Sequence, residues 1–152
     1  MIEYRLATVS DIDALVQSRL EMLRVVNNLR DDYTFGEDFV QASRDYFREG
    51  DQITVFALDD DKIVGCASIC FLQIMPTFSH PTGKRAHLMN VYTEADYRRK
   101  GIAYIMTTML IEEAWNRGAT EISLDATESG RPLYRKCGFK DSDECMVLLR
   151  DE

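Results

Sequence analysis

Three consecutive basic residues followed by a glycine, Arg98-Arg99-Lys100-Gly101, form the stretch whose residue types most clearly indicate chemistry. An apolar, strand-like segment ends just before them at Tyr92, and an apolar helical face begins just after them at Ile102. The first N–H groups of a helix have no partner within the helix and favour anions, and arginine binds phosphate oxygens in a bidentate manner. Glycine lets the backbone approach a ligand closely. The stretch therefore predicts a site for a phosphate or pyrophosphate group.

This turn resembles the Arg/Gln-x-x-Gly-x-Gly/Ala signature of the Gcn5-related N-acetyltransferase (GNAT) superfamily, with Ala103 in place of the second glycine. Two further segments resemble family motifs in the family's order. Arg5-Leu6-Ala7 lies near the start, and Leu133-Tyr134-Arg135-Lys136-Cys137-Gly138-Phe139 lies near the end. The resemblance covers most of the chain. It implies a GNAT-like α/β fold, a central twisted mixed sheet with helices on both faces.

The resemblance also implies acetyl-CoA as the cofactor. Family members hold the pyrophosphate on the backbone of the turn and hold the pantetheine arm and thioester on the end of the preceding strand. The residues at these positions are Val91, Tyr92, Thr93, Arg98, Arg99, Lys100, Gly101, Ile102, Ala103 and Tyr104. A backbone N–H near Val91 is expected to polarise the thioester carbonyl, as an oxyanion hole does. Thr127 stands where many members have an asparagine that contacts the cofactor arm, which leaves that contact open.

Tyr134 matches the tyrosine that serves as general acid in many family members, and a phenol with a pKa of about 10 is still protonated at neutral pH. An attacking amine must be neutral, so a general base is expected as well. Three carboxylates are candidates, and the sequence leaves the choice among them open: Asp125, Glu94 and Glu128. His80 and His87 are not assigned catalytic roles, because isolated histidines are more often packed or solvated.

Composition favours one domain over residues 1–152, with 45% hydrophobic and 29% charged residues. The formal net charge of −8 argues against nucleic-acid binding and favours a cationic acceptor such as an amine. Neither a signal-peptide core nor a membrane span is evident, which predicts a cytoplasmic protein. The spacing of Cys66, Cys70, Cys137 and Cys145 favours reduced, buried thiols over a metal site or disulfide framework.

Hydrophobic periodicity predicts the element order βααβββαβαβ. Strands are expected at 2–6, 53–58, 63–72, 86–92, 122–124 and 145–149. Helices are expected after a cap at Ser10, at 38–49, from 102 to a stop near Gly118, and at 131–137. Tyr33, Phe35 and Tyr46 are candidates to line an acceptor pocket, with ordinary packing as the alternative.

These expectations combine into an acetyl-CoA-dependent N-acetyltransferase that transfers an acetyl group to a primary amine of a small molecule by direct attack. A protein or peptide N-acetyltransferase is the alternative on the same scaffold. The alternative outside enzymes is a non-catalytic acyl-CoA-binding regulatory module, which would not require Tyr134 as an acid. A homodimer is consistent with analogy to small family members.

Overall fold

A five-stranded sheet with strand order β1-β2-β3-β4-β5 forms the centre of the computed structural model, which describes residues 1–151 and leaves Glu152 outside the described residues. Strands β1 (Ile2–Leu6), β2 (Gln52–Asp59), β3 (Lys62–Gln73) and β4 (Lys84–Thr93) pair antiparallel, and β5 (Glu121–Leu124) pairs parallel with β4. The predicted mixed sheet is confirmed.

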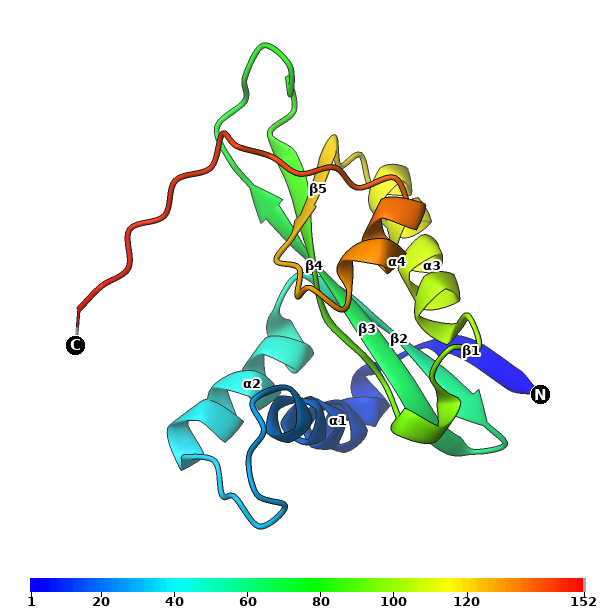
Figure 1. Cartoon of the computed structure of the whole chain (residues 1–152). Coiled ribbons are helices and arrows are strands. Elements are labelled where there is room, and N and C mark those ends of the chain that lie inside the picture. Colours follow the sequence, from blue (N-terminus) through cyan, green and yellow to red (C-terminus); the bar gives the residue numbers. More distant parts are fainter. Residues whose placement is uncertain (152) are drawn as a thin grey trace.

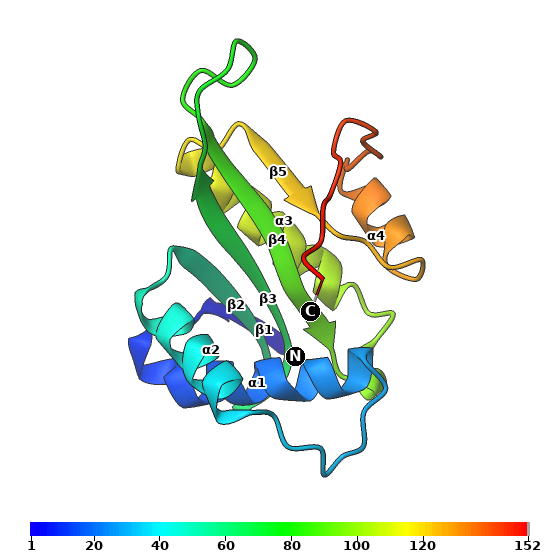
Figure 2. The same cartoon turned by 90° about the vertical axis from the view of Figure 1, so that its left-hand side faces the viewer.

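Helices cover both faces of the sheet (Figures 1 and 2). Helices α1 (Ile12–Val26) and α2 (Glu37–Glu49) lie together on one face, and α3 (Ile102–Asn116) lies on the other. The short α4 (Arg131–Lys136) lies beside α3, where the Lys136 ammonium sits 4.3 Å from the centre of the Tyr104 ring. The 3₁₀ helices η1 (Val9–Asp11) and η2 (Ala95–Tyr97) precede α1 and α3.

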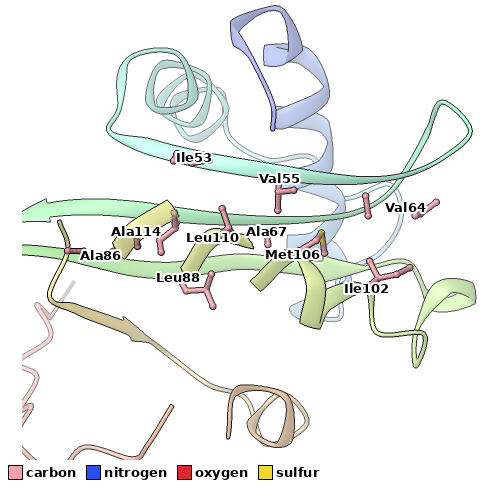
Figure 3. Close-up of a cluster of buried hydrophobic side chains, with 13 residues drawn as sticks. Ile53, Val55, Val64, Ala67, Ala86, Leu88, Ile102, Met106, Leu110 and Ala114 are labelled. Atoms are coloured by element: carbon pink, nitrogen blue, oxygen red, sulfur yellow. The ribbon is translucent and has the colours of Figure 1, made fainter. Parts of the chain in front are cut away.

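The larger core lies between α3 and the sheet (Figure 3). Ile102, Met106, Leu110 and Ala114 recur every fourth residue along α3, so they share one helix face. They pack against aliphatic strand residues that include Val55, Ala67 and Leu88. Burying a side chain such as leucine stabilises the fold by about 1.5–3 kcal/mol. Because Ile102 is buried at the first turn of α3, the core also fixes the position of the preceding loop.

The entry to α1 differs from the expected cap at Ser10. Thr8 is the N-cap of the 3₁₀ turn η1, and Asp11 at the end of that turn is the N-cap of α1; the Thr8 N–H donates to Asp11 Oδ2 at 2.8 Å. The guanidinium of Arg5 donates to both oxygens of the same carboxylate, at 2.8 and 3.0 Å. These hydrogen bonds, first from Arg5 and then from Thr8, lower the pKa of Asp11 to about 2.

The predicted last strand at 145–149 is wrong. This segment is extended but forms no ladder with any strand in residues 1–151, although the outer edge of β5 is open there. In Figure 1 the chain leaves α4, crosses near β5 and runs away from the body. The side chains of Met146, Val147, Leu148 and Leu149 are 74% to 98% exposed. An apolar run has strand-like composition, but it becomes a strand only when its backbone finds a partner.

Candidate active site

Strands β4 and β5 separate where the active site was expected. Their pairing ends at Leu88 and Leu124, whereas β4 continues to Thr93. On its other side, the register of β4 with β3 shifts between Cys66 and Ser68, opposite a bulge that contains Asn90 with a φ of 60°. Positive φ is uncommon outside glycine, and such bulges recur beside active sites. The end of β4 therefore offers a backbone edge that β5 does not cover.

The side chains at this edge lie close to the basic turn. Arg98 Nε donates to the Thr93 carbonyl at 3.0 Å, and its guanidinium lies 5.9 Å from the centre of the Tyr92 ring. The hydroxyl oxygen of Thr93 is buried without a hydrogen-bond partner among the described residues. Val91 packs against the core. Arg98 therefore ties the turn to the end of β4, and Thr93 retains an unused polar atom there.

The turn before α3 has the backbone conformation that an anion site needs. Arg99 and Gly101 adopt left-handed φ values of 63° and 79°. The first helical hydrogen bond runs from Ile105 N–H to the Gly101 carbonyl at 3.1 Å. Within residues 1–151, the N–H groups from Arg99 to Tyr104 donate no hydrogen bond. These donors, together with the positive end of the helix dipole, fit a phosphate group.

Tyr134 is half-buried on α4, with its ring in an edge-to-face contact with Phe139 at 6.0 Å. Burial, with a smaller contribution from Cys137, raises the pKa of the Tyr134 phenol. The group therefore remains protonated at neutral pH and retains a proton to donate.

The turn that leads into α4 shapes the space around Tyr134. A Cβ added to Gly130 would lie 3.0 Å from the Tyr134 ring and 3.2 Å from Thr127 Oγ1. The Gly130 N–H donates to Thr127 Oγ1 at 3.2 Å, so this hydroxyl stabilises the turn. This hydrogen bond gives Thr127 a role in positioning the turn before α4. A contact between Thr127 and a cofactor stays a prediction.

The structure separates the three candidate bases. Asp125 follows β5 at the point of separation, and its fully exposed carboxylate lies 3.6 Å from His87 Nε2. Glu94 lies at the other end of the open edge, 3.2 Å from Lys62 Nζ. Glu128 is 96% exposed and lies 3.5 Å from Arg131 Nε.

His87 was not assigned a role from the sequence, but it lies beside one of the candidate bases. Its Nδ1 is 2.8 Å from Ser123 Oγ, across the parallel pair that β4 forms with β5. No local motif predicts this proximity. The register of β4 with β5, which places His87 beside a residue 36 positions later in the sequence, creates it.

A cavity of about 230 Å³ lies between α1, α2 and the sheet. Its wall combines three aromatic rings with smaller apolar and polar groups, and the lining residues are Arg19, Phe39, Ala42, Ser43, Tyr46, Phe47, Gln52, Ser68, Cys70, Met89 and Asn90. Of the aromatic residues proposed for an acceptor pocket, Tyr46 lines this cavity. Tyr33 and Phe35 do not: their rings pack edge-to-face at 5.0 Å, and Phe35 contacts Phe39 at 5.7 Å.

A series of hydrogen bonds connects polar side chains that line this cavity, from Arg19 to Gln52. Arg19 donates to Asn90 Oδ1 at 3.3 Å, and Asn90 Nδ2 donates to Ser68 Oγ at 3.1 Å. The Ser68 and Thr54 hydroxyls are 2.6 Å apart, and Thr54 donates to Gln52 Oε1 at 2.7 Å. No local pattern in the sequence predicts these hydrogen bonds, because the residues that form them come from α1, β2, β3 and β4. Through Asn90, the series connects the cavity to the bulge of β4.

Comparison with known proteins identifies the class to which this site belongs. The family model described as Acetyltransferase (GNAT) family matches residues 20–139. The chain therefore belongs to the GNAT family of acetyltransferases, whose cofactor is acetyl-CoA.

Three relatives show how far the similarity extends. A predicted acetyltransferase from Clostridium acetobutylicum, solved with acetyl-CoA, is 31% identical, with a TM-score of 0.85 and coverage of 98% of this chain and 96% of that one. The glucosamine 6-phosphate N-acetyltransferase of Trypanosoma brucei brucei is 31% identical over 57% of this chain and 57% of its own length. The Schizosaccharomyces pombe enzyme of the same name is 30% identical over 57% of this chain and 76% of its own length.

The aligned part thus spans little more than half of the trypanosomal relative. Among residues 1–151, no helix combines the length and the apolar character that crossing a membrane requires.

Proposed function

We propose that this protein is an acetyl-CoA-dependent N-acetyltransferase that acetylates a primary amine of a small molecule. The observation that carries the proposal is the run of backbone N–H groups from Arg99 to Tyr104, which donate no hydrogen bond within residues 1–151 and lie beside the open edge of β4. A helix N-terminus with such donors fits the pyrophosphate of the cofactor. The buried hydroxyl of Thr93, unpartnered among the residues that the structure describes, fits a polar group bound along the same edge.

Acetyl-CoA, when bound, supplies an acetyl group activated as a thioester. Within the proposal, the backbone from Val91 to Thr93 orients that end of the cofactor, and Arg98 holds the turn against the strand. The phenol of Tyr134 donates a proton to the departing sulfur. Its raised pKa keeps the proton in place until then.

We assign the base to Asp125 rather than Glu94. Asp125 lies at the separation of β4 and β5, where its carboxylate contacts His87. Glu94 is held in an ion pair with Lys62. The acceptor ammonium would lose a proton to Asp125, directly or through the imidazole of His87, and the resulting neutral amine would then attack.

A small acceptor is favoured over a protein or peptide. The cavity beside the bulge has a volume of about 230 Å³, and small-molecule sites are typically concave pockets lined by apolar groups with a few polar ones. The names of the trypanosomal and yeast relatives, which refer to an amino-sugar phosphate, support the same class of acceptor. The free cysteines, one of them exposed at Cys145, are compatible with a reducing compartment, and a cytoplasmic location is part of the proposal.

The first experiment measures the melting temperature with and without acetyl-CoA, with ATP and NADH as control ligands. At about 100 times its Kd, a ligand adds about 2.7 kcal/mol, which corresponds to a rise of roughly 5–10 °C for a chain of this size. A panel of primary amines is then screened for release of free CoA thiol.

A rise with acetyl-CoA alone, followed by turnover of at least one small amine, supports the proposal. Stabilisation without turnover of any amine or peptide would favour the acyl-CoA-binding regulatory module. Equal responses to all the nucleotides would contradict a dedicated acetyl-CoA site.

A further inference from the structure

The only charged side chain that lines the acceptor cavity, within the part of the chain that the structure describes, is cationic. That side chain is Arg19, on α1. The whole sequence contains 26 Asp and Glu residues against 18 Lys and Arg, yet none of the carboxylates within residues 1–151 lines this cavity. A cavity that only had to attract an ammonium group would be expected to carry the opposite charge.

The guanidinium of Arg19 has unused hydrogen-bonding capacity. It is half-buried, and its only hydrogen bond within residues 1–151 goes to the neutral amide oxygen of Asn90. Arg85 differs in charge pairing, because its partly buried guanidinium donates to the Glu121 carboxylate at 2.6 Å. Burial lowers the pKa of Arg19, and the groups that oppose this effect among the described residues are Cys66 and Cys70 rather than a carboxylate. Removing a charge from water without pairing it is costly. An anionic partner that accepts hydrogen bonds from the remaining N–H groups of Arg19 would reduce that cost.

The surroundings of Arg19 hold it in place to receive such a partner. The Asn90 amide that accepts from Arg19 donates in turn to Ser68, so its oxygen cannot turn away without breaking the series of hydrogen bonds. Burial, followed by a hydrogen bond with Cys70, raises the pKa of Tyr46, so its hydroxyl stays neutral and donates to the Asp51 carbonyl at 3.4 Å. Phe39 and Phe47 add apolar wall to the same cavity.

We propose that the acceptor amine also carries an anionic group, a carboxylate or a phosphate, and that Arg19 binds this group in the cavity. The inference rests on the proposed function and specifies its substrate class. Arg19 is joined through Asn90 to the bulge of β4, so an anion bound there leaves the rest of the acceptor close to the open backbone edge. The amine would lie on that side, and the apolar part of the acceptor would lie against the aromatic wall.

The test compares amines in matched pairs that differ mainly in the anionic group. Glucosamine 6-phosphate against glucosamine tests phosphate, and phenylalanine against phenethylamine tests carboxylate. For wild-type protein we expect kcat/KM to be roughly 10- to 100-fold higher for the anionic member of at least one pair, since a hydrogen bond to a charged group contributes about 1.5–3 kcal/mol. Arg19→Met should abolish that preference, and Arg19→Lys should restore part of it.

A binding arm separates this inference from the proposed function. Each amine is titrated by calorimetry into the protein saturated with CoA, with Arg30→Met as the control of equal charge change, because the Arg30 side chain is 86% exposed and lies outside the cavity. Tighter binding of an anionic amine by wild type and Arg30→Met than by Arg19→Met supports the assignment.

Three results would overturn it. The first is an equal kcat/KM for the anionic and neutral members of both pairs. The second is that neither anionic amine binds in the calorimeter, and the third is that Arg19→Met prefers the anionic amine as strongly as wild type does. Turnover of neutral amines together with any of these would leave the acetyltransferase proposal standing. Acetyl-CoA binding by Arg19→Met, measured by its melting temperature, verifies that the variant is folded.

Discussion

The two halves of the proposed site differ in which groups form them. The proposed cofactor half consists mainly of backbone: the N–H groups from Arg99 to Tyr104 and the open edge of β4 as far as Thr93. These groups lie within one short stretch of sequence. The acceptor half consists of side chains that come from two helices and three strands, from Arg19 to Asn90. A backbone site tolerates many side chains as long as the chain keeps its path, whereas a side-chain site depends on the identity of each residue.

Substitutions should therefore separate the two halves. A change in the path of the backbone at the turn should affect cofactor binding whichever amine is present. A change in the cavity should affect the choice of amine and leave cofactor binding intact. Substitution of Tyr134, the proposed proton donor, should affect turnover and neither binding step.

The largest effect is expected for Tyr134→Phe. Removing the hydroxyl deletes the proposed proton donor while keeping the ring that packs on Phe139, so kcat should fall by about 10²–10⁴-fold. The melting-temperature shift with acetyl-CoA should be unchanged. Tyr33→Phe is the matched control, because Tyr33 lies outside the cavity and its substitution should leave kcat unaltered. A similar kcat for Tyr134→Phe and wild type would remove Tyr134 from the mechanism.

A smaller effect, confined to the cofactor half, is expected for Gly101→Ala. An alanine Cβ would meet no atom within 4 Å, but the φ of 79° costs a residue with a side chain roughly 1–2 kcal/mol. If the turn relaxes to relieve that strain, its N–H groups move, and the Kd for acetyl-CoA should rise about 10-fold.

Gly36→Ala provides the control for this substitution. Gly36 also has open space around a built Cβ, but its φ is −61°. Calorimetry should find the same acetyl-CoA affinity for Gly36→Ala and wild type. Equal losses in the two variants would mean that backbone conformation at Gly101 is not what the cofactor site requires.

The smallest effect is expected for Asp11→Asn, at the entry to the helix that carries Arg19. The folded pKa of Asp11, about 2, lies below its ordinary value of 3.8, so its stabilisation is present above about pH 4 and is lost as the pH falls towards 2. Because Arg5 is about half exposed, we expect a loss of only about 1–2 kcal/mol at pH 7.

Chemical denaturation at several pH values checks this prediction. The difference between Asp11→Asn and wild type should shrink between pH 4 and pH 2, and acetyl-CoA affinity at pH 7 should not change. Asp32→Asn, in the exposed pair with Arg30, should cost almost nothing at any pH. A cost for Asp11→Asn that is independent of pH would show that the carboxylate charge is not the stabilising feature.

The sequence predicted the cofactor half better than the acceptor half, because the information for the former is local. A strand, a glycine at the point of positive φ and an apolar helix face follow one another between Val91 and Leu110, and each leaves a recognisable pattern. The expected strands and helices before Gly138 were placed correctly to within a few residues for the same reason.

The acceptor half could not be derived in this way. Asn90 is an unremarkable residue in sequence, and only the register of β3 with β4 reveals it as the bulge residue that contacts Arg19. His87 likewise meets Asp125 only through the pairing of β4 with β5. The prediction of a strand at 145–149 was wrong for a related reason. The composition of a segment indicates that it can form a strand, but it does not indicate whether another strand is placed to pair with it.

Asn90 belongs to both halves, since its backbone forms the bulge beside the cofactor edge and its amide holds Arg19 at the acceptor cavity. Phe39 and Phe47 line the cavity from α2 and take no part in the bulge of β4. In evolutionary terms, the helices can therefore exchange side chains and change the accepted amine without disturbing the use of the cofactor. A change at Asn90 would alter both at once, which makes this position the strongest constraint on how new acceptors can arise on this scaffold.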